Sequence, residues 1–368
     1  MDDGSGACRQ TGNAVWHSSR SDTWGHGAVA MKILVTGATS GLGRNAAEYL
    51  LQQGHQVHAT GRNQAAAQWL HQYQASFTAL DLGQASAEQC AQLMHGCEAV
   101  WHCAAKSSPW GSWTEFYQAN VVATRKLAQA AGTVGVARFV HISTPAVYFD
   151  YRPHYQLSEE YCPKRFVNSY AASKYAAEQE ILKLLPRFPE TIYTILRPRG
   201  LFGPHDRVIL PRILNQLQDG QQQLRLPGGG KALLDLTFVL NVVQAMMLAT
   251  TTAGLASGRI YNITNQQPQH LVDMLQQLLT EQLGWHYQIR DVPYPLAYSV
   301  AALLEGVAKL TGKEPLWTRY GIGALYYDMT LDNSRAISEL GYQPQYSLVQ
   351  AFEITAQWLR QQGISRHG

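Results

Sequence analysis

Short apolar runs alternate along the chain with longer stretches whose apolar residues recur three and four positions apart. Runs of this length suit strands that are buried on both faces, and the longer stretches suit helices that pack on such strands. The repeated order of strand, helix and strand predicts an α/β fold with a doubly wound parallel sheet. The predicted strands are 32–36, 56–60, a third that ends before Asp81, 99–105 running into a turn, 139–144, 191–196 and 259–263.

The pattern after residue 200 is mostly helical and predicts a smaller substrate lobe beside the sheet domain. We expect the sheet domain to cover residues 31–200, with 236–263 returning to it, and the lobe to comprise 201–235 and 264–368. Residues 1–30 are rich in Gly, Ser, His and Trp and lack a signal-peptide pattern, so we expect a disordered leader. The predicted helices of this half are 207–223, 239–249, 271–283, 294–304, 331–340 and 348–359.

Composition narrows the class of protein. With 46% hydrophobic and 15% charged residues, a chain of 368 residues can bury a large core. A formal charge of +3 is too small to indicate a nucleic-acid partner. The cysteines are odd in number and lack a C-x-x-C pair, which favours reduced thiols and a cytoplasmic location. No apolar run is long enough to span a membrane, and no histidine spacing such as H-E-x-x-H indicates a metal site.

A glycine-rich turn follows the first predicted strand and opens the first predicted helix, in the stretch T-G-A-T-S-G-L-G. This context is the one a dinucleotide-binding fingerprint requires, and it predicts a Rossmann fold. The first glycine permits a tight turn, the second lets the backbone approach a pyrophosphate, and the third allows close packing of helix on strand, with the phosphates at the helix N-terminus. The residues expected there are Gly37, Thr39, Ser40, Gly41, Leu42 and Gly43.

The end of the second predicted strand should select between cofactors. An acidic residue there would hold the 2′-hydroxyl of NAD, but this chain has Thr60-Gly-Arg-Asn63. The Arg62 guanidinium could instead pair with a 2′-phosphate. The sequence therefore favours NADP over NAD, with stacking or solvation of Arg62 as the alternative.

Tyr170 and Lys174 lie four residues apart in N-S-Y-A-A-S-K, which places them one turn apart on one face of a helix. A nearby ammonium favours the phenolate, so we expect Lys174 to lower the pKa of Tyr170. Such a phenol can exchange a proton with an alcohol or a carbonyl.

Several segments together resemble the extended short-chain dehydrogenase/reductases. They are the glycine turn, the Tyr-x-x-x-Lys pair, R-P-R-G-L-F-G-P and the G-Y-Q-P turn, and the likeness covers about residues 31–360. Within that group the chain most resembles 3β-hydroxysteroid dehydrogenase-like proteins of the epimerase/dehydratase type, through the segments 107–111, 142–150, 206–211 and 235–239.

The resemblance implies roles for particular residues. Thr144 takes the position of a hydroxyl that holds the substrate oxygen, although a shift of one residue would give that position to Ser143. Asn120 matches a helical Asn that organises the proton relay, and Lys174 would also bind the nicotinamide ribose. The resemblance further implies cofactor contacts for Asp81, Leu82, Ala104, Ala105, Arg197 and Pro198.

The implied reaction is hydride transfer between NAD(P) and a secondary alcohol or ketone. Leu234 stands where nucleotide-sugar enzymes carry an Arg that grips a diphosphate, which argues for a small hydrophobic substrate, either 3-hydroxysteroid-like or long-chain 3-oxoacid-like. The apolar segment 294–304 could form a lid, a peripheral membrane contact or a core helix. Relatives often form homodimers, so we expect one here.

Two other functions stay open at this stage. An epimerase or dehydratase would recycle its bound cofactor without net consumption. A non-catalytic NADP-binding sensor would bind the cofactor and turn over no substrate, although such proteins tend to lose the Tyr or the Lys that this chain retains.

Overall fold

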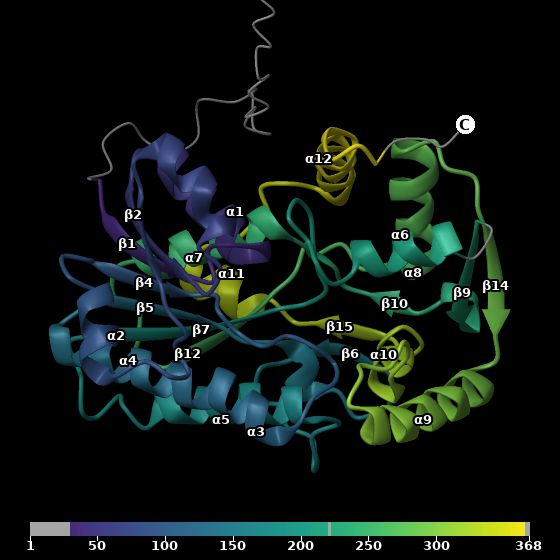
Figure 1. Ribbon diagram of the computed structural model, residues 1–368, viewed down its shortest axis with the longest axis horizontal. Helices are drawn as coiled ribbons and strands as arrows, with labels where there is room; N and C mark the ends of the chain where they lie inside the picture. The colour runs from purple at the N-terminus through teal and green to yellow at the C-terminus, as the bar shows by residue number, and fades with distance from the viewer. Residues whose placement is uncertain (1–29, 220–221, 365–368) are drawn as a thin grey trace, which may run out of the picture.

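A computed structural model of the chain describes residues 30–219 and 222–364 (Figure 1). The expected leader, residues 1–30, lies almost entirely outside the described residues. Figure 1 shows a layered α/β domain beside a second group of helices and short strands that come mainly from the C-terminal half.

The α/β domain is built on a parallel sheet of seven strands in the order β12-β7-β5-β4-β1-β2-β3. The direction in which successive strands are added reverses between β1 and β4. Strand β1 pairs in parallel with β2 on one side, where Ile33 lies opposite Val57, and with β4 on the other, where Ile33 lies opposite Ala99. A crevice forms at such a reversal, outside the carboxyl ends of the strands. The strands are β1 (Lys32–Thr36), β2 (Gln56–Gly61), β3 (Ser76–Ala79), β4 (Ala99–His102), β5 (Arg138–Ile142), β7 (Ile192–Pro198) and β12 (Arg259–Ile263).

Helices cover both faces of this sheet, because successive strand residues point to opposite faces and both sets are apolar and must be buried. Ile33 and Val35 of β1 belong to a core shared with helices α1 and α7, whereas Leu34 belongs to a core shared with α2, α4 and α5. The helices are α1 (Gly41–Gln52), α2 (Ala87–Leu93), α4 (Ala123–Val134), α5 (Ser169–Leu182) and α7 (Val239–Thr251). The predicted Rossmann architecture is confirmed.

The lobe contains more strand than the helical pattern indicates. A four-stranded sheet has the order β13-β10-β15-β6, and β14 pairs with β9. These strands are β6 (His154–Leu157), β9 (Gln223–Pro227), β10 (Leu233–Leu234), β13 (Gln269–His270), β14 (Gln288–Val292) and β15 (Met329–Leu331). Strand β6 precedes β7 in the chain, so the lobe sheet draws on both halves of the sequence.

The lobe helices agree with the predicted segments, with shifted ends. The first is shorter at its start because the Asp206 carboxylate accepts hydrogen bonds from three backbone N–H groups, including that of Leu210, the first residue of the helix. The predicted 294–304 helix continues to Thr311 and ends at Gly312, whose φ is +71°. The helices are α6 (Leu210–Asp219), α8 (Leu271–Leu275) with its π-helical continuation η5 (Gln276–Gln282), α9 (Tyr294–Thr311), α10 (Arg319–Ala324), α11 (Ser334–Leu340) and α12 (Leu348–Gln361). Within the described residues, none of the helices has the length and apolar character needed to cross a membrane.

Candidate active site

A cleft of about 790 Å³ lies at the carboxyl ends of the central strands and is closed in part by residues of the lobe. Residues that follow β1, β2, β4, β5 and β7 all line it, which is where the strand reversal predicts a ligand. Every residue predicted to contact the cofactor lines this cleft except Arg197. Four of the five predicted catalytic residues line it as well, namely Ser143, Thr144, Tyr170 and Lys174.

The glycine turn has the geometry expected of a phosphate-binding loop. Gly37 has a φ of +69°, in the left-handed region, and leads the chain from β1 into the turn. A Cβ atom at Gly43 would lie 2.4 Å from the Gly37 carbonyl oxygen, so only glycine allows α1 to start this close to the turn. Ser40 is the N-cap residue of α1 and has no side-chain capping hydrogen bond. The Gly41 N–H donates to the His205 carbonyl at 3.1 Å, and the next two residues of the helix, Leu42 and Gly43, line the cleft.

The adenosine end of the cleft contains one exposed cation and one acidic turn. Arg62 follows β2 and is exposed, and no described carboxylate forms an ion pair with it. Asp81 uses its Oδ1 atom to accept a hydrogen bond of 3.0 Å from the Gly83 N–H. This bond fixes the loop after β3, and Leu82 beside it is buried against the cleft.

Helix α5 carries Tyr170 and Lys174 into the cleft. The Asn168 side chain caps the helix by accepting a hydrogen bond of 2.8 Å from the Ala171 N–H, which sets the start of the helix just before Tyr170. The Lys174 ammonium is almost fully buried, donates a hydrogen bond of 2.6 Å to the Ile142 carbonyl and lies 3.2 Å from His141 Nε2. Burial lowers the pKa of Lys174 to about 8.

The structure corrects the prediction that Lys174 lowers the pKa of Tyr170. Burial raises the pKa of Tyr170, and the group that opposes this rise is the nearby Thr144 hydroxyl and not Lys174. The Lys174 ammonium is held by the end of β5, so in the structure it does not act on the phenol in the way that the helical spacing predicts.

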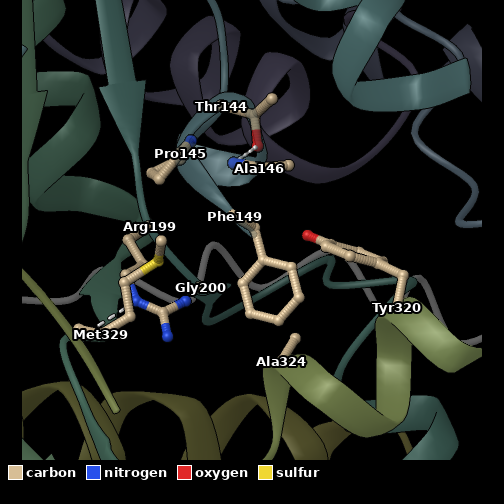
Figure 2. A pocket seen from close by; sticks show the side chains of 9 residues that line it. All are labelled: Thr144, Pro145, Ala146, Phe149, Arg199, Gly200, Tyr320, Ala324 and Met329. Carbon is tan, nitrogen blue, oxygen red and sulfur yellow. Dashed lines mark hydrogen bonds between the residues drawn. The ribbon is translucent and has the colours of Figure 1, made fainter. Parts of the chain in front are cut away.

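The structure also distinguishes the two adjacent hydroxyls after β5. The Ser143 hydroxyl donates a hydrogen bond to the Glu178 carboxylate, which has no exposed surface. The Thr144 hydroxyl accepts a hydrogen bond of 3.2 Å from the Ala146 N–H (Figure 2), and Thr144 lines the cleft together with Tyr170. Thr144 therefore shares a substrate-sized space with Tyr170, whereas Ser143 is committed to a buried carboxylate.

Asn120 lies in a π-helical segment, η2 (Tyr117–Val122), between α3 (Trp113–Phe116) and α4. Such segments often occur at functional sites. Its side chain accepts a hydrogen bond of 2.7 Å from the Lys106 N–H and donates to the Ser173 hydroxyl at 2.9 Å. Asn120 does not line the cleft, and it ties the loop after β4 to helix α5.

The structure also corrects the prediction that Arg197 contacts the cofactor. Its guanidinium is buried and forms a two-pronged ion pair with Glu178, at 2.9 Å from Nε and 2.5 Å from Nη2. Nη1 donates to the Tyr148 hydroxyl at 2.7 Å. The neighbouring Pro198 does line the cleft, as predicted.

Two residues of the site were missed from the sequence. Arg199 and Tyr320 line a small cavity that also touches Thr144 (Figure 2). The signal for Arg199 was present, as a second charged residue in Arg197-Pro-Arg-Gly200 after a buried strand. Nothing in the sequence pattern indicates Tyr320, because it lies in the first turn of a short lobe helix, 150 positions after Tyr170.

Comparisons with known proteins show relatives that match nearly the whole chain. The chain is 46% identical to the uncharacterized protein YbjS of Escherichia coli strain K12 over 335 residues, 90% of this chain and 99% of that protein. It is 30% identical to a 2-alkyl-3-oxoalkanoate reductase of Stenotrophomonas maltophilia, over 86% of this chain and 96% of that protein. The solved structure of UDP-glucuronic acid 4-epimerase from Bacillus cereus with NAD shares the fold, with a TM-score of 0.72 at 21% identity, over 90% of this chain and 97% of that chain.

The family model for the NAD dependent epimerase/dehydratase family matches residues 33–264, which span the glycine turn, the Tyr170–Lys174 helix and the last strand of the large sheet. With this match and the likeness to YbjS over nearly the whole chain, the protein belongs to the NAD dependent epimerase/dehydratase family.

Proposed function

We propose that the protein is an NAD(P)-dependent oxidoreductase that interconverts a ketone and a secondary alcohol on a hydrophobic substrate. The observation that carries the proposal is that Tyr170, Lys174 and Thr144 line the same cleft as the glycine turn. The name of the similar oxoalkanoate reductase supports the direction of ketone reduction.

The residues around the cleft fit a dinucleotide, because the glycine turn and the start of α1 line it together with Arg62, and Gly43 lets α1 start against the turn. When bound, the cofactor would supply or accept the hydride at its nicotinamide ring. Tyr170 would give its phenolic proton to the carbonyl oxygen during reduction and take it back during oxidation. Thr144 would hold that oxygen by a hydrogen bond, and the Lys174 ammonium would provide positive charge beside the cofactor ribose.

The test is a spectrophotometric assay of NADPH and NADH at 340 nm with long-chain 3-oxo compounds, 3-oxosteroids and nucleotide sugars. Turnover of a hydrophobic ketone is expected, and Tyr170→Phe should reduce kcat by several orders of magnitude while cofactor affinity changes little. Near-normal turnover by this variant would remove Tyr170 from its role. Product formation from a nucleotide sugar without net cofactor oxidation would instead support an epimerase, and bound cofactor with no turnover would support a sensor.

We propose NADP as the preferred cofactor. Arg62 is exposed at the end of β2, has no carboxylate partner among the described residues and faces the adenosine end of the cleft. A guanidinium there suits a 2′-phosphate. The Arg62→Ala variant should bind NADPH at least tenfold more weakly and NADH nearly unchanged; an equal loss for both cofactors would contradict the assignment.

We also propose a peripheral membrane contact through α9. Its buried face consists of small residues and Glu305, whereas its opposite face exposes apolar side chains in a continuous stripe, with Lys309 and Lys313 near its end. This pattern suits an interfacial helix on an anionic bilayer. The stripe consists of Leu296, Val300, Leu303, Val307 and Leu310, exposed by 58%, 36%, 69%, 49% and 90%.

Sedimentation with vesicles of phosphatidylglycerol and phosphatidylcholine tests this contact. Leu303→Glu should abolish co-sedimentation, whereas Val349→Glu, at an exposed position of 63% on α12, should leave it unchanged. Equal binding by both variants would count against α9 as the contact. We further propose a cytoplasmic homodimer, which sedimentation velocity of the purified protein would test.

A further inference from the structure

A small cavity of about 60 Å³ lies behind Thr144, on the lobe side of the cleft (Figure 2). Thr144, Gly200 and Tyr320 line both this cavity and the large cleft, so the two spaces adjoin. The cavity wall is otherwise largely apolar, with Phe149 and Met329 on it. A substrate oxygen held by Thr144 would therefore lie at the entrance to a small chamber that has both polar and apolar walls.

The charged side chain of Arg199 forms part of the wall of that chamber. The Arg199 backbone is fixed, because its carbonyl accepts a hydrogen bond of 2.6 Å from the Thr237 hydroxyl. Within residues 30–219 and 222–364, its side chain makes one hydrogen bond, in which Nε donates to the Met329 carbonyl at 3.0 Å. Figure 2 shows this single bond and the guanidinium reaching toward the space across from Phe149 and Tyr320.

The two terminal nitrogens of Arg199 have no hydrogen-bond partner among the described residues, and no described carboxylate lies within ion-pair distance of them. Asp235 is the acidic group whose charge acts on Arg199. Its Oδ2 atom accepts from the Leu331 N–H at 2.9 Å and its Oδ1 atom has no hydrogen-bond partner among the described residues, so the two side chains are not in ion-pair contact. A guanidinium on the wall of this chamber with both terminal nitrogens free presents up to four N–H donors to a ligand. Arg197, two residues earlier, contrasts with it, since all three of its nitrogens have partners.

We propose that Arg199 is an anion subsite that binds a substrate carboxylate close to the reacting carbonyl. The proposal rests on the proposed function, because Thr144 and Tyr170 must hold the ketone oxygen for the neighbouring group to reach Arg199. A planar carboxylate can accept two parallel hydrogen bonds from a guanidinium, which fixes the orientation of the substrate as well as its charge. Of the two hydrophobic classes that suit the cleft, this selects a long-chain 3-oxo acid over a neutral 3-oxosteroid.

The experiment compares a 3-oxo acid with its methyl ester, which keeps the ketone and the chain but removes the charge. For the wild-type protein with NADPH, kcat/KM should be higher for the acid. Arg199→Met should lower kcat/KM for the acid by roughly 10- to 150-fold, the range expected for hydrogen bonds to a charged group, and should change the value for the ester by less than about threefold. Arg199→Lys, which keeps the charge without the planar fork, should recover part of the loss for the acid only.

A second measurement separates this inference from the proposed function. Calorimetric titration of the protein with NADPH present, using the 3-hydroxy acid and its methyl ester, reports binding without turnover, because cofactor and ligand are both in the reduced form and no hydride can be transferred. Selective loss of acid binding in Arg199→Met supports the subsite even if neither ketone is reduced, an outcome that would refute only the proposed reaction. Equal losses for acid and ester in both measurements, or a wild-type preference for the ester, would overturn the subsite.

Discussion

Replacing Arg197 by Met tests whether this arginine serves the cofactor, as the family resemblance implies, or the fold, as its contacts indicate. Arg197 and Glu178 expose 3% and 0% of their side chains and share two hydrogen bonds. The substitution keeps much of the side-chain volume but leaves the Glu178 carboxylate buried with the Ser143 hydroxyl as its remaining partner.

The size of the effect follows from that uncompensated charge. Breaking a buried ion pair from one side costs about 3–5 kcal/mol, because the remaining charge has lost its partner without regaining water. The double variant Arg197→Met/Glu178→Met removes both charges and should lose less stability than the single variant. Arg259→Met is a matched control, because its pair with Glu339 is exposed by 46% and 29% and should contribute less than about 1 kcal/mol.

Urea unfolding followed by tryptophan fluorescence gives the free energy of unfolding, and NADPH titration of the folded variants gives cofactor affinity. We expect Arg197→Met to lose stability with little change in the NADPH Kd of the folded protein. The reasoning is refuted if Arg197→Met unfolds at the same urea concentration as the wild-type protein while its Kd rises tenfold or more.

Two further predictions concern groups that line the cleft. Thr144→Ala should lower kcat at least 100-fold and keep wild-type stability. Ser143→Ala removes only a hydrogen-bond donor to Glu178, so it should lower the free energy of unfolding by about 1–3 kcal/mol and retain most activity. Steady-state kinetics and thermal unfolding check both effects, and a larger loss of kcat in Ser143→Ala than in Thr144→Ala would return the substrate contact to Ser143. Because burial lowers the pKa of Lys174 to about 8, the ammonium is charged below that pH and neutral above it, so the NADPH Kd should rise as pH increases through 8. Fluorescence titration between pH 6.5 and 9.5 should show this rise in the wild-type protein and not in Lys174→Met, and identical profiles would contradict the role of the ammonium.

Local sequence patterns predicted much of the fold correctly. The strands have short apolar runs, and the glycine turn needs backbone conformations that its residues alone reveal, such as the positive φ of Gly37. The spacing of Tyr170 and Lys174 was sufficient to place both on one face of α5 and into one cleft. These features depend on residues close together in the chain, so the pattern carries the information.

The ends of the helices and strands, and the lobe, were harder to predict because they depend on residues far apart in the chain. The predicted helix 331–340 begins three residues later, at Ser334, and Leu331 is the last residue of strand β15, because three residues that pair with β6 and β10 have no periodicity of their own. Its strand conformation comes from partners about 95 and 175 positions away, Leu234 and His154.

The partners of charged side chains were decided only when distant elements came together. Arg197 and Arg199 stand two residues apart in one motif, yet one pairs with Glu178 of α5 and the other faces a chamber closed by Tyr320 of the lobe. Lys174 has the right spacing to act on Tyr170, but the carbonyl at the end of β5 holds its ammonium. Sequence specifies which groups are available and on which face of an element they lie, whereas burial and the docking of elements decide which of those groups meet, because hydrogen bonds and ion pairs act over only a few ångströms.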